Sequence, residues 1–349
     1  MPLAVAGGGD VGDTEVDAEK GVGFGDVDIG DVTGGDQQPH AVAVDQVGFA
    51  LAVGGQRAGL LGVGSSPGAP SVSLYTIEDE TTEYDDDVPM TLTELQDSIR
   101  RVLGAHLPLA GSTRLSRFTF KARQAERYRD GRILLAGDAA HLFPATGVAL
   151  NAGLLDAVNL AWKLAADLHG RAPAGLLDTY HAERHLAGAR TMLHTRAQVA
   201  LRRGHDAAAE ALREVFSELL ADEQPLRRMG AMVAGADIRY PMPGTNPLAG
   251  TFAPDLTLHT DQGITGVAEL LHPARPILLD LADRPDLRKA ARAWGQRVDV
   301  HTAKTGRRSA DVLLIRPDAH IAWAAPIDEP ADTAAPALRE ALSSWFGTP

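Results

Sequence analysis

The spacing of hydrophobic residues changes along the chain, and it separates predicted strands from predicted helices. Apolar and polar residues alternate over 71–77 and 114–120, which predicts strands with one buried face. Between them, the capping-box sequence Thr91-Leu-Thr-Glu94 precedes apolar residues at helical spacing, so a helix ending at Gly104 is predicted. The apolar run 132–136 predicts a strand buried on both faces.

Helical spacing dominates the middle of the chain, up to a predicted linker at 247–258. Helices are expected over 122–128, 150–167, 176–203 and 207–220. The predicted packing face of the helix 150–167 is Leu154, Val158, Ala161 and Leu164 or Ala165, with Trp162 and Lys163 partly outward. Beyond the linker, strands are expected over 276–281, 298–300, 311–315 and 320–323, and helices over 285–294 and 334–346.

The first 70 residues differ in composition from the rest. They hold 17 of the 36 glycines and ten acidic residues against two basic ones. Gly7-Gly-Gly9-Asp-Val-Gly12 spells the dinucleotide-binding fingerprint G-x-G-x-x-G, but no helical pattern follows it, so we interpret it as irregular or weakly strand-forming. Residues 22–29 partly alternate, which permits short hairpin strands, and 62–68 is predicted to be a flexible connection.

Composition and charge exclude several classes of function. The length of 349 residues is enough for two or three domains, and 44% hydrophobic with 23% charged residues is ordinary for a globular protein. The absence of cysteine excludes disulfides and thiol chemistry. No apolar run is long enough for a membrane span, and no secretory signal is present, so the cytoplasm is the expected location. A net charge of −13 argues against nucleic acid and anionic membranes as partners.

The clearest candidate site follows the apolar run 132–136. Gly137-Asp138 ends that run, a loop with Pro144 and Gly147 comes next, and the helix 150–167 begins there. A carboxylate at the end of such a strand can accept hydrogen bonds from sugar-like hydroxyls. The free N–H groups at the helix N-terminus favour a developing negative charge, and Gly153 would permit a close approach of backbone to a flat ligand.

This segment resembles the class A flavoprotein aromatic hydroxylases, the p-hydroxybenzoate hydroxylase superfamily, and most of all its phenol hydroxylase, rifampicin monooxygenase and polyketide hydroxylase branch. The family pattern G-R-V-x-L-x-G-D-A-A-H, then P-x-G-G-x-G-x-N-x-G-x-x-D-A-x-N-L-x-W-K-L-A, is matched at Gly131, Arg132, Gly137, Asp138, Ala139, Ala140, His141, Pro144, Gly147, Asn151, Gly153, Asp156, Ala157, Asn159, Leu160, Trp162, Lys163, Leu164 and Ala165. The helix sequence Tyr180-His-Ala-Glu183-Arg184 and the segment Asp237-Ile-Arg239-Tyr240 also fit.

The resemblance implies an α/β fold and an FAD site. The fold would be a partial FAD/NAD(P)-binding domain of the p-hydroxybenzoate hydroxylase type with a thioredoxin-like C-terminal domain, which lacks cysteines and would serve packing or contacts in a homo-oligomer. The family's cofactor-binding positions fall on Gly137, Asp138, Pro144, Gly147, Val148, Ala149, Leu150 and Asn151. Asp138 would bind the ribityl chain, Pro144 would pack over the isoalloxazine, and Gly147 to Asn151 would line its pyrimidine edge. The implied reaction hydroxylates a small aromatic substrate with NAD(P)H as co-substrate and O2; no catalytic residue is assigned.

Three sequence regions are therefore expected: an atypical segment 1–70, a partial FAD-binding monooxygenase domain 71–245, and the C-terminal domain 246–349. The family's N-terminal G-x-G-x-x-G unit is not recognisable, so we hypothesise a truncated family member in which residues 1–60 lie outside the native reading frame. The upstream DNA would test this. The alternative function is a non-catalytic remnant that acts only in assembly.

One histidine pair has a spacing that occurs in metal sites. His181 and His185 lie four residues apart on a predicted helix, a spacing that can place two imidazoles on one ion. No acidic residue at 182 completes the H-E-x-x-H motif, so we interpret the pair as a solvated helix face and predict no metal.

Overall fold

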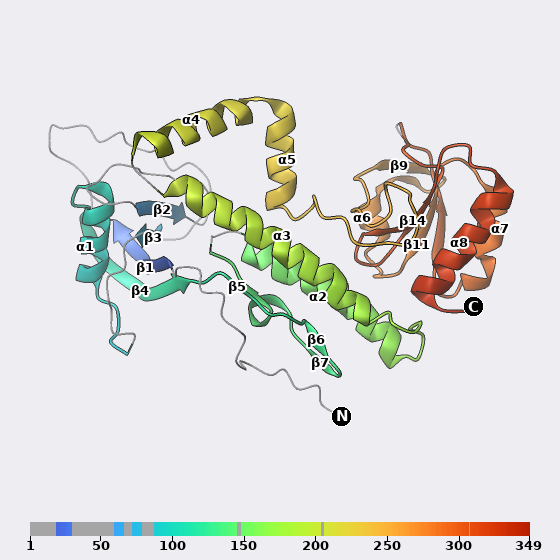
Figure 1. Ribbon diagram of the computed structural model, residues 1–349, viewed down its shortest axis with the longest axis horizontal. Coiled ribbons are helices and arrows are strands. Elements are labelled where there is room, and N and C mark those ends of the chain that lie inside the picture. The colour runs from blue at the N-terminus through green and yellow to red at the C-terminus, as the bar shows by residue number, and fades with distance from the viewer. Residues whose placement is uncertain are drawn as a thin grey trace.

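The structure is a computed structural model that describes residues 19–29, 59–65, 72–78, 87–144, 148–203, 206–306 and 308–349. The described residues form an N-terminal sheet, a central set of helices and a C-terminal α/β domain (Figure 1). The fingerprint at 7–12 lies outside the described residues. Among the helices that the structure describes, none is long and apolar enough to cross a membrane.

The N-terminal sheet has four strands in the order β2-β3-β1-β4, all paired antiparallel. Its strands are β1 (Glu19–Ile29), β2 (Gly59–Ser65), β3 (Val72–Glu78) and β4 (Leu109–Phe120). The predicted strands at 71–77 and 114–120 are confirmed. Residues 22–29 are extended, but they belong to the single 11-residue strand β1 and do not form short hairpin strands. The prediction of a flexible connection is wrong for residues 62–65, because β2 pairs with β3 along its whole length.

Helix α1 (Leu92–Leu103) packs on this sheet and begins and ends as its sequence predicts. The Thr91 hydroxyl accepts a hydrogen bond from the backbone N–H of Glu94 at 3.2 Å, and Gly104 closes the helix with φ of +71°. Its apolar face is fully buried together with a residue of β3, in a cluster that includes Leu74, Leu95, Ile99 and Val102. The capping box and the apolar period were therefore sufficient here.

Two predictions for residues 122–136 are wrong. The segment 122–128 is not a helix: β5 (Arg123–Gln124) pairs antiparallel with β8 (His141–Leu142), and this pairing outweighs the local helical preference. The run 132–136 is not a strand buried on both faces. Only β7 (Ile133–Leu134) is a strand, it pairs with β6 (Arg129–Asp130), and the Ile133 side chain is 44% exposed.

The central helices are α2 (Ala149–Leu168), α3 (Asp178–Arg202), α4 (Ala207–Ala221) and α5 (Glu223–Val233). The first three are confirmed predictions, whereas α5 was not predicted. Helices α2 and α3 lie side by side, and α4 and α5 arch over α3, with α5 returning to contact it (Figure 1).

Helix α2 packs with the opposite face from the one predicted. Its buried positions are Ala152, Asp156, Asn159 and Lys163, which follow one another at helical spacing. Leu154 and Val158, predicted to pack, are 55% and 46% exposed. Periodicity located the helix correctly, but the partners of the polar residues determine which face is buried.

The C-terminal domain has the order β12-β11-β13-β14, with β11 parallel to β12 and the other pairs antiparallel. Its strands are β11 (Ile277–Asp280), β12 (Asp299–Thr302), β13 (Val312–Ile315) and β14 (Ile321–Ala325). One face packs on α7 (Pro285–Ala291) and α8 (Ala331–Phe346). The other is covered by residues 248–271, which contain β9 (Thr257–Thr260), β10 (Gly263–Gly266) and α6 (Val267–Leu270). Burial on both faces explains the continuous apolar runs.

Candidate functional site

The Gly-Asp sequence forms a tight turn pressed against the first turns of α2. Gly137 has φ of +59° and begins a short 3-10 helix, Gly137–Ala139. The Ala140 N–H donates to the Gly137 carbonyl at 2.8 Å and closes this turn. A Cβ on Gly153 would lie 3.3 Å from the Cα of Gly137. The missing side chain of Gly153 therefore makes room for the backbone of the Gly137 turn, and not for a ligand as the sequence suggests.

Asp138 stands out from this turn into solvent. Its side chain is exposed and makes no hydrogen bond or ion pair with the residues that the structure describes. By contrast Asp156, beneath the turn, is fully buried. Of these two carboxylates, only Asp138 can accept hydrogen bonds from a bound molecule.

The N-terminus of α2 opens beside the turn. Its N-cap residue Val148 provides no capping side chain, and no acidic residue lies in the first turn. The first helical acceptor is the Val148 carbonyl, which takes the N–H of Ala152 at 3.0 Å, so Ala149, Leu150 and Asn151 have no acceptor within the helix. These N–H groups and the helix dipole favour negative charge at this end.

The remaining predicted cofactor-binding residues differ in exposure. Leu150 is 73% exposed and Asn151 is also exposed, whereas Pro144 is buried. The Val148 side chain is buried in a cluster with Phe143 and Met192, so only its backbone faces the helix N-terminus. Gly147 lies outside the described residues. The structure thus brings Gly137, Asp138 and 148–151 together.

A buried carboxylate lies under the turn. One oxygen of Asp156 accepts from the Gly137 N–H at 2.9 Å and from His141 Nε2 at 2.7 Å, and the other accepts from Arg184 Nε at 2.6 Å. Burial by itself would raise the pKa of the Asp156 carboxyl. The His141 hydrogen bond and the Arg184 charge outweigh it and hold that pKa below its ordinary value.

A second buried ionic cluster joins α2 and α3 to the C-terminal domain. Arg316 donates to both oxygens of Glu183 at 2.6 and 2.7 Å and also to Asp318. Lys163 Nζ donates to Glu183 at 2.7 Å and to Asn159 at 2.8 Å, and the Asn159 amide donates to Asp318 at 3.0 Å. Two cations thus face two anions in one buried cluster, which fixes the domain against the helices.

These two clusters make the fold sensitive to acid. Burial alone would raise the pKa values of Glu183 and Asp318, but Arg316 lowers both below the ordinary carboxyl range, as His141 and Arg184 do for Asp156. The folded state therefore binds fewer protons than the unfolded state near the ordinary carboxyl pKa. This stabilisation is complete above that pKa and is lost as the pH falls toward the folded values.

We therefore expect the melting temperature to hold from about pH 7 to pH 5 and to fall steeply below about pH 4. Circular dichroism melts at steps of pH would measure it. A Glu183→Gln variant, which lacks one of the proton-linked groups, should have a lower melting temperature at neutral pH and a shallower fall in acid. A wild-type melting temperature that stays level down to pH 3 would contradict the assignment.

The histidine pair on α3 does not form the solvated helix face that was predicted. His181 Nδ1 accepts the backbone N–H of Tyr128 at 3.2 Å, and both imidazoles contact the Tyr128 ring. Both side chains are half-buried, which corrects the predicted solvated face. No group of three or more metal-ligating side chains occurs in the described part of the chain.

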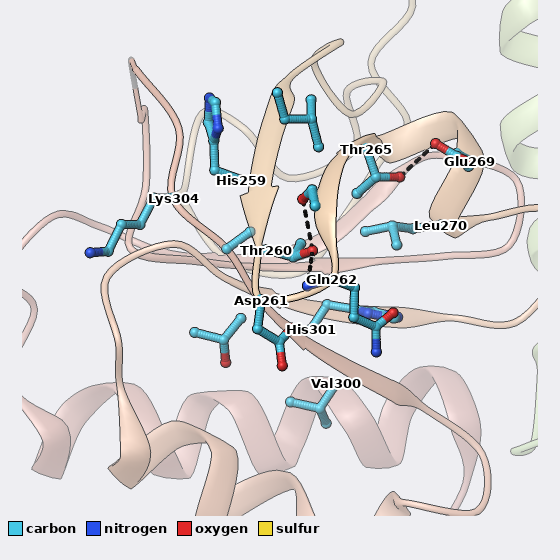
Figure 2. Close-up of a pocket in the computed structure, with 14 residues that line it drawn as sticks. His259, Thr260, Asp261, Gln262, Thr265, Glu269, Leu270, Val300, His301 and Lys304 are labelled. Carbon is cyan, nitrogen blue, oxygen red and sulfur yellow. Dashed lines mark hydrogen bonds between the residues drawn. The ribbon is translucent and has the colours of Figure 1, made fainter.

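A separate hollow lies on the C-terminal domain. Its volume is about 1070 Å³. Figure 2 shows that it lies between the β9–β10 hairpin and β12. Its polar side chains carry both signs of charge, as at Asp261 and Lys304, and Thr265 donates to Glu269 at 2.7 Å. None of the predicted cofactor-binding residues lines it.

Residues 27–195 match the family described as FAD binding domain, and residues 246–349 match the family described as aromatic-ring hydroxylase, C-terminal. The first match begins well before residue 71, where the sequence resemblance was expected to start, because family-like sequence extends into the glycine-rich segment.

Curated relatives are enzymes of similar description. The chain is 42% identical over 269 residues to 12-dehydrotetracycline 5-monooxygenase/anhydrotetracycline 6-monooxygenase of Streptomyces rimosus, covering 75% of this chain and 52% of that protein. It is 35% identical to the rifampicin monooxygenase of Streptomyces venezuelae, covering 81% and 56%. The chain thus spans about half the length of the curated relatives it matches.

The solved structures that resemble this chain include aromatic hydroxylases. The anhydrotetracycline hydroxylase OxyS of Streptomyces rimosus superposes with a TM-score of 0.76 at 34% identity, over 96% of this chain and 65% of that one. An aromatic hydroxylase from angucycline biosynthesis, CabE, gives a TM-score of 0.74 at 34% identity, over 95% and 65%. The fold is that of the p-hydroxybenzoate hydroxylase-like enzymes, as predicted.

Proposed function

Because this chain belongs to the FAD-dependent aromatic-ring hydroxylases, we propose that its residues 137–151 bind the flavin end of FAD in a monooxygenase that hydroxylates a small aromatic substrate. The observation behind this proposal is the exposed carboxylate of Asp138, which has no hydrogen-bond or ion-pair partner among the described residues, on a turn held against the first turns of α2. The carboxylate can accept hydrogen bonds from hydroxyl groups of a ligand. The N–H groups at the helix N-terminus can stabilise negative charge on an adjacent ring.

The residues present fit this group. Asp138 would accept hydrogen bonds from the ribityl hydroxyls, and the N–H groups of Ala149, Leu150 and Asn151 would face the pyrimidine edge of the ring. Gly153 lets the turn at Gly137 pack closely against α2, since a Cβ on Gly153 would lie 3.3 Å from the Cα of Gly137. Pro144 and the Val148 side chain are buried.

The bound flavin would supply the oxidative chemistry, with electrons from NAD(P)H and oxygen from O2. The chain would contribute position and electrostatics: Asp138 orients the ribityl chain, and the α2 N-terminus stabilises negative charge on the ring system. The names of two relatives specify anhydrotetracycline and rifampicin, which supports a phenolic or polyketide-like aromatic substrate.

The proposal predicts that the purified chain binds FAD and that Asp138→Asn weakens binding about tenfold or more, with an unchanged melting temperature because the side chain is exposed. Quenching of flavin fluorescence on titration would measure the dissociation constant. Asp255→Asn is the matched control, since Asp255 is also exposed but lies in the C-terminal domain. A folded wild-type chain that binds no FAD at high concentration would refute the proposal and favour a role in assembly only.

A further inference from the structure

We propose that Asp156 is the positioning residue of this site: its buried carboxylate, held by His141 and Arg184, fixes the Gly137 turn and so aims Asp138. The identity of the ligand that Asp138 binds rests on the proposed function. The fixing of the turn by Asp156 does not depend on any ligand. Asp156 itself is fully buried and cannot touch a ligand.

The Gly137 amide is held from outside the turn. Its N–H points to Asp156 on α2, 19 residues along the chain, and not to a neighbour within the turn. Because Gly137 has φ of +59°, the turn leaves the direction of the preceding strand, and local hydrogen bonding closes only its other end, from Ala140 to the Gly137 carbonyl. The side chain of Asp156 thus fixes the end from which Asp138 projects.

The carboxylate cannot rotate away, because three donors from three segments hold it. Arg184 on α3 donates to one oxygen and is itself fixed by the Tyr240 hydroxyl at 2.9 Å and the Ala152 carbonyl at 3.1 Å. His141 on β8 donates Nε2–H to the other oxygen, since an ionised carboxylate only accepts. A charge-assisted hydrogen bond of this kind is stronger than a neutral one.

Substitution of His141 is the most specific test. Its hydrogen bond to Asp156 can be removed and restored without leaving a buried charge unpaired, because Asp156 stays paired with Arg184. Its ring stacks on Phe143 with centroids 4.6 Å apart, and Nδ1 has no hydrogen-bond partner among the described residues. His141→Leu keeps the apolar contact and deletes the donor. His141→Gln returns an N–H donor near the place of Nε2. Arg184 stays paired with Asp156 in both variants.

Two measurements are needed on the wild type, His141→Leu and His141→Gln, with His141→Ala as a second donor-free variant should leucine prevent folding. Hydrogen–deuterium exchange without ligand should be faster over 134–143 in the donor-free variant and close to wild type in His141→Gln, with 311–325 in the C-terminal domain unchanged in all. The FAD dissociation constant should rise about tenfold in the donor-free variant and return to within about threefold of wild type in His141→Gln.

The outcomes separate this inference from the proposed function. Unchanged exchange over 134–143 in a folded donor-free variant would overturn the hold on the turn, whether or not FAD binds. Faster exchange with an unaltered dissociation constant would overturn the link to Asp138. A wild type that binds no FAD would refute the proposed function, and the exchange result would still decide whether Asp156 fixes the turn. Equal losses in His141→Leu and His141→Gln would indicate a packing role and would also contradict the inference.

Discussion

Replacing Arg316 by methionine should lower the free energy of unfolding by about 3–5 kcal/mol. Arg316 is completely buried and donates to Glu183 on α3 and to Asp318 on its own hairpin. Methionine keeps much of the volume but removes the charge, so Lys163 would remain as the only cation facing two buried carboxylates in this cluster. An uncompensated buried charge costs more than the lost hydrogen bonds alone.

The packing around Arg316 adds to this effect. Its guanidinium lies 5.2 Å from the Trp162 ring centroid on α2 and 4.5 Å from that of Trp345 on α8, so cation–π contacts would be lost as well. Because these contacts span the junction of helices and C-terminal domain, we expect the variant to lose cooperativity between the two parts.

Urea denaturation followed by circular dichroism would measure the loss. Arg227→Met is the matched control, because the Arg227–Glu223 pair on α5 is 78% and 76% exposed and should be worth less than about 0.5 kcal/mol. Similar midpoints for the two arginine variants would show that the buried cluster does not stabilise the fold.

Gly250→Ala is the second large expected effect, a loss of at least about 3 kcal/mol. Gly250 has φ of +85°, and a Cβ there would lie 2.1 Å from the backbone oxygen of Tyr240. That oxygen cannot move without disturbing two hydrogen bonds, from the Tyr240 N–H to the Gly250 carbonyl at 2.9 Å and from the Gly250 N–H to the Ile321 carbonyl at 2.8 Å. The strain thus falls where the linker meets β14.

Gly230→Ala should have the opposite sign. Gly230 lies exposed within α5, with open space around its would-be Cβ, so alanine should stabilise the helix by up to about 1 kcal/mol. Thermal melts of both variants would test the pair. If Gly250→Ala melts within a degree or two of wild type, the close approach of Tyr240 is not a constraint on the fold.

Much of the architecture was predictable from local pattern. The capping box at Thr91, the alternation in β3 and β4, and the apolar strands and helices of the C-terminal domain all depend on residues close together in sequence. Helix α5 was not predicted; it contains Pro225 and Gly230, two residue types that disfavour a helix, and its residues are largely exposed.

The candidate site shows where local pattern stops being sufficient. The sequence identified Gly137, Asp138 and the start of α2, because a glycine-aspartate pair after an apolar run and a following helix are short-range features. It did not assign roles to Asp156, His141 or Arg184, which lie on α2, β8 and α3 and meet only in the folded chain. The sequence did carry a signal, because Asp156, Asn159 and Lys163 recur at helical spacing within a largely apolar helix.

Spacing and motifs within a few dozen residues were enough to predict most of the helices and strands, to indicate the family, and to identify Gly137 and Asp138 as site residues. Only the tertiary structure decided which face of α2 is buried. Hydrophobicity favoured Leu154 and Val158, but the buried partners Arg184, Glu183 and Asp318 come from elsewhere in the chain and satisfy Asp156, Lys163 and Asn159. A polar side chain can be buried only when its partner is in place, and the partner is fixed by the fold as a whole.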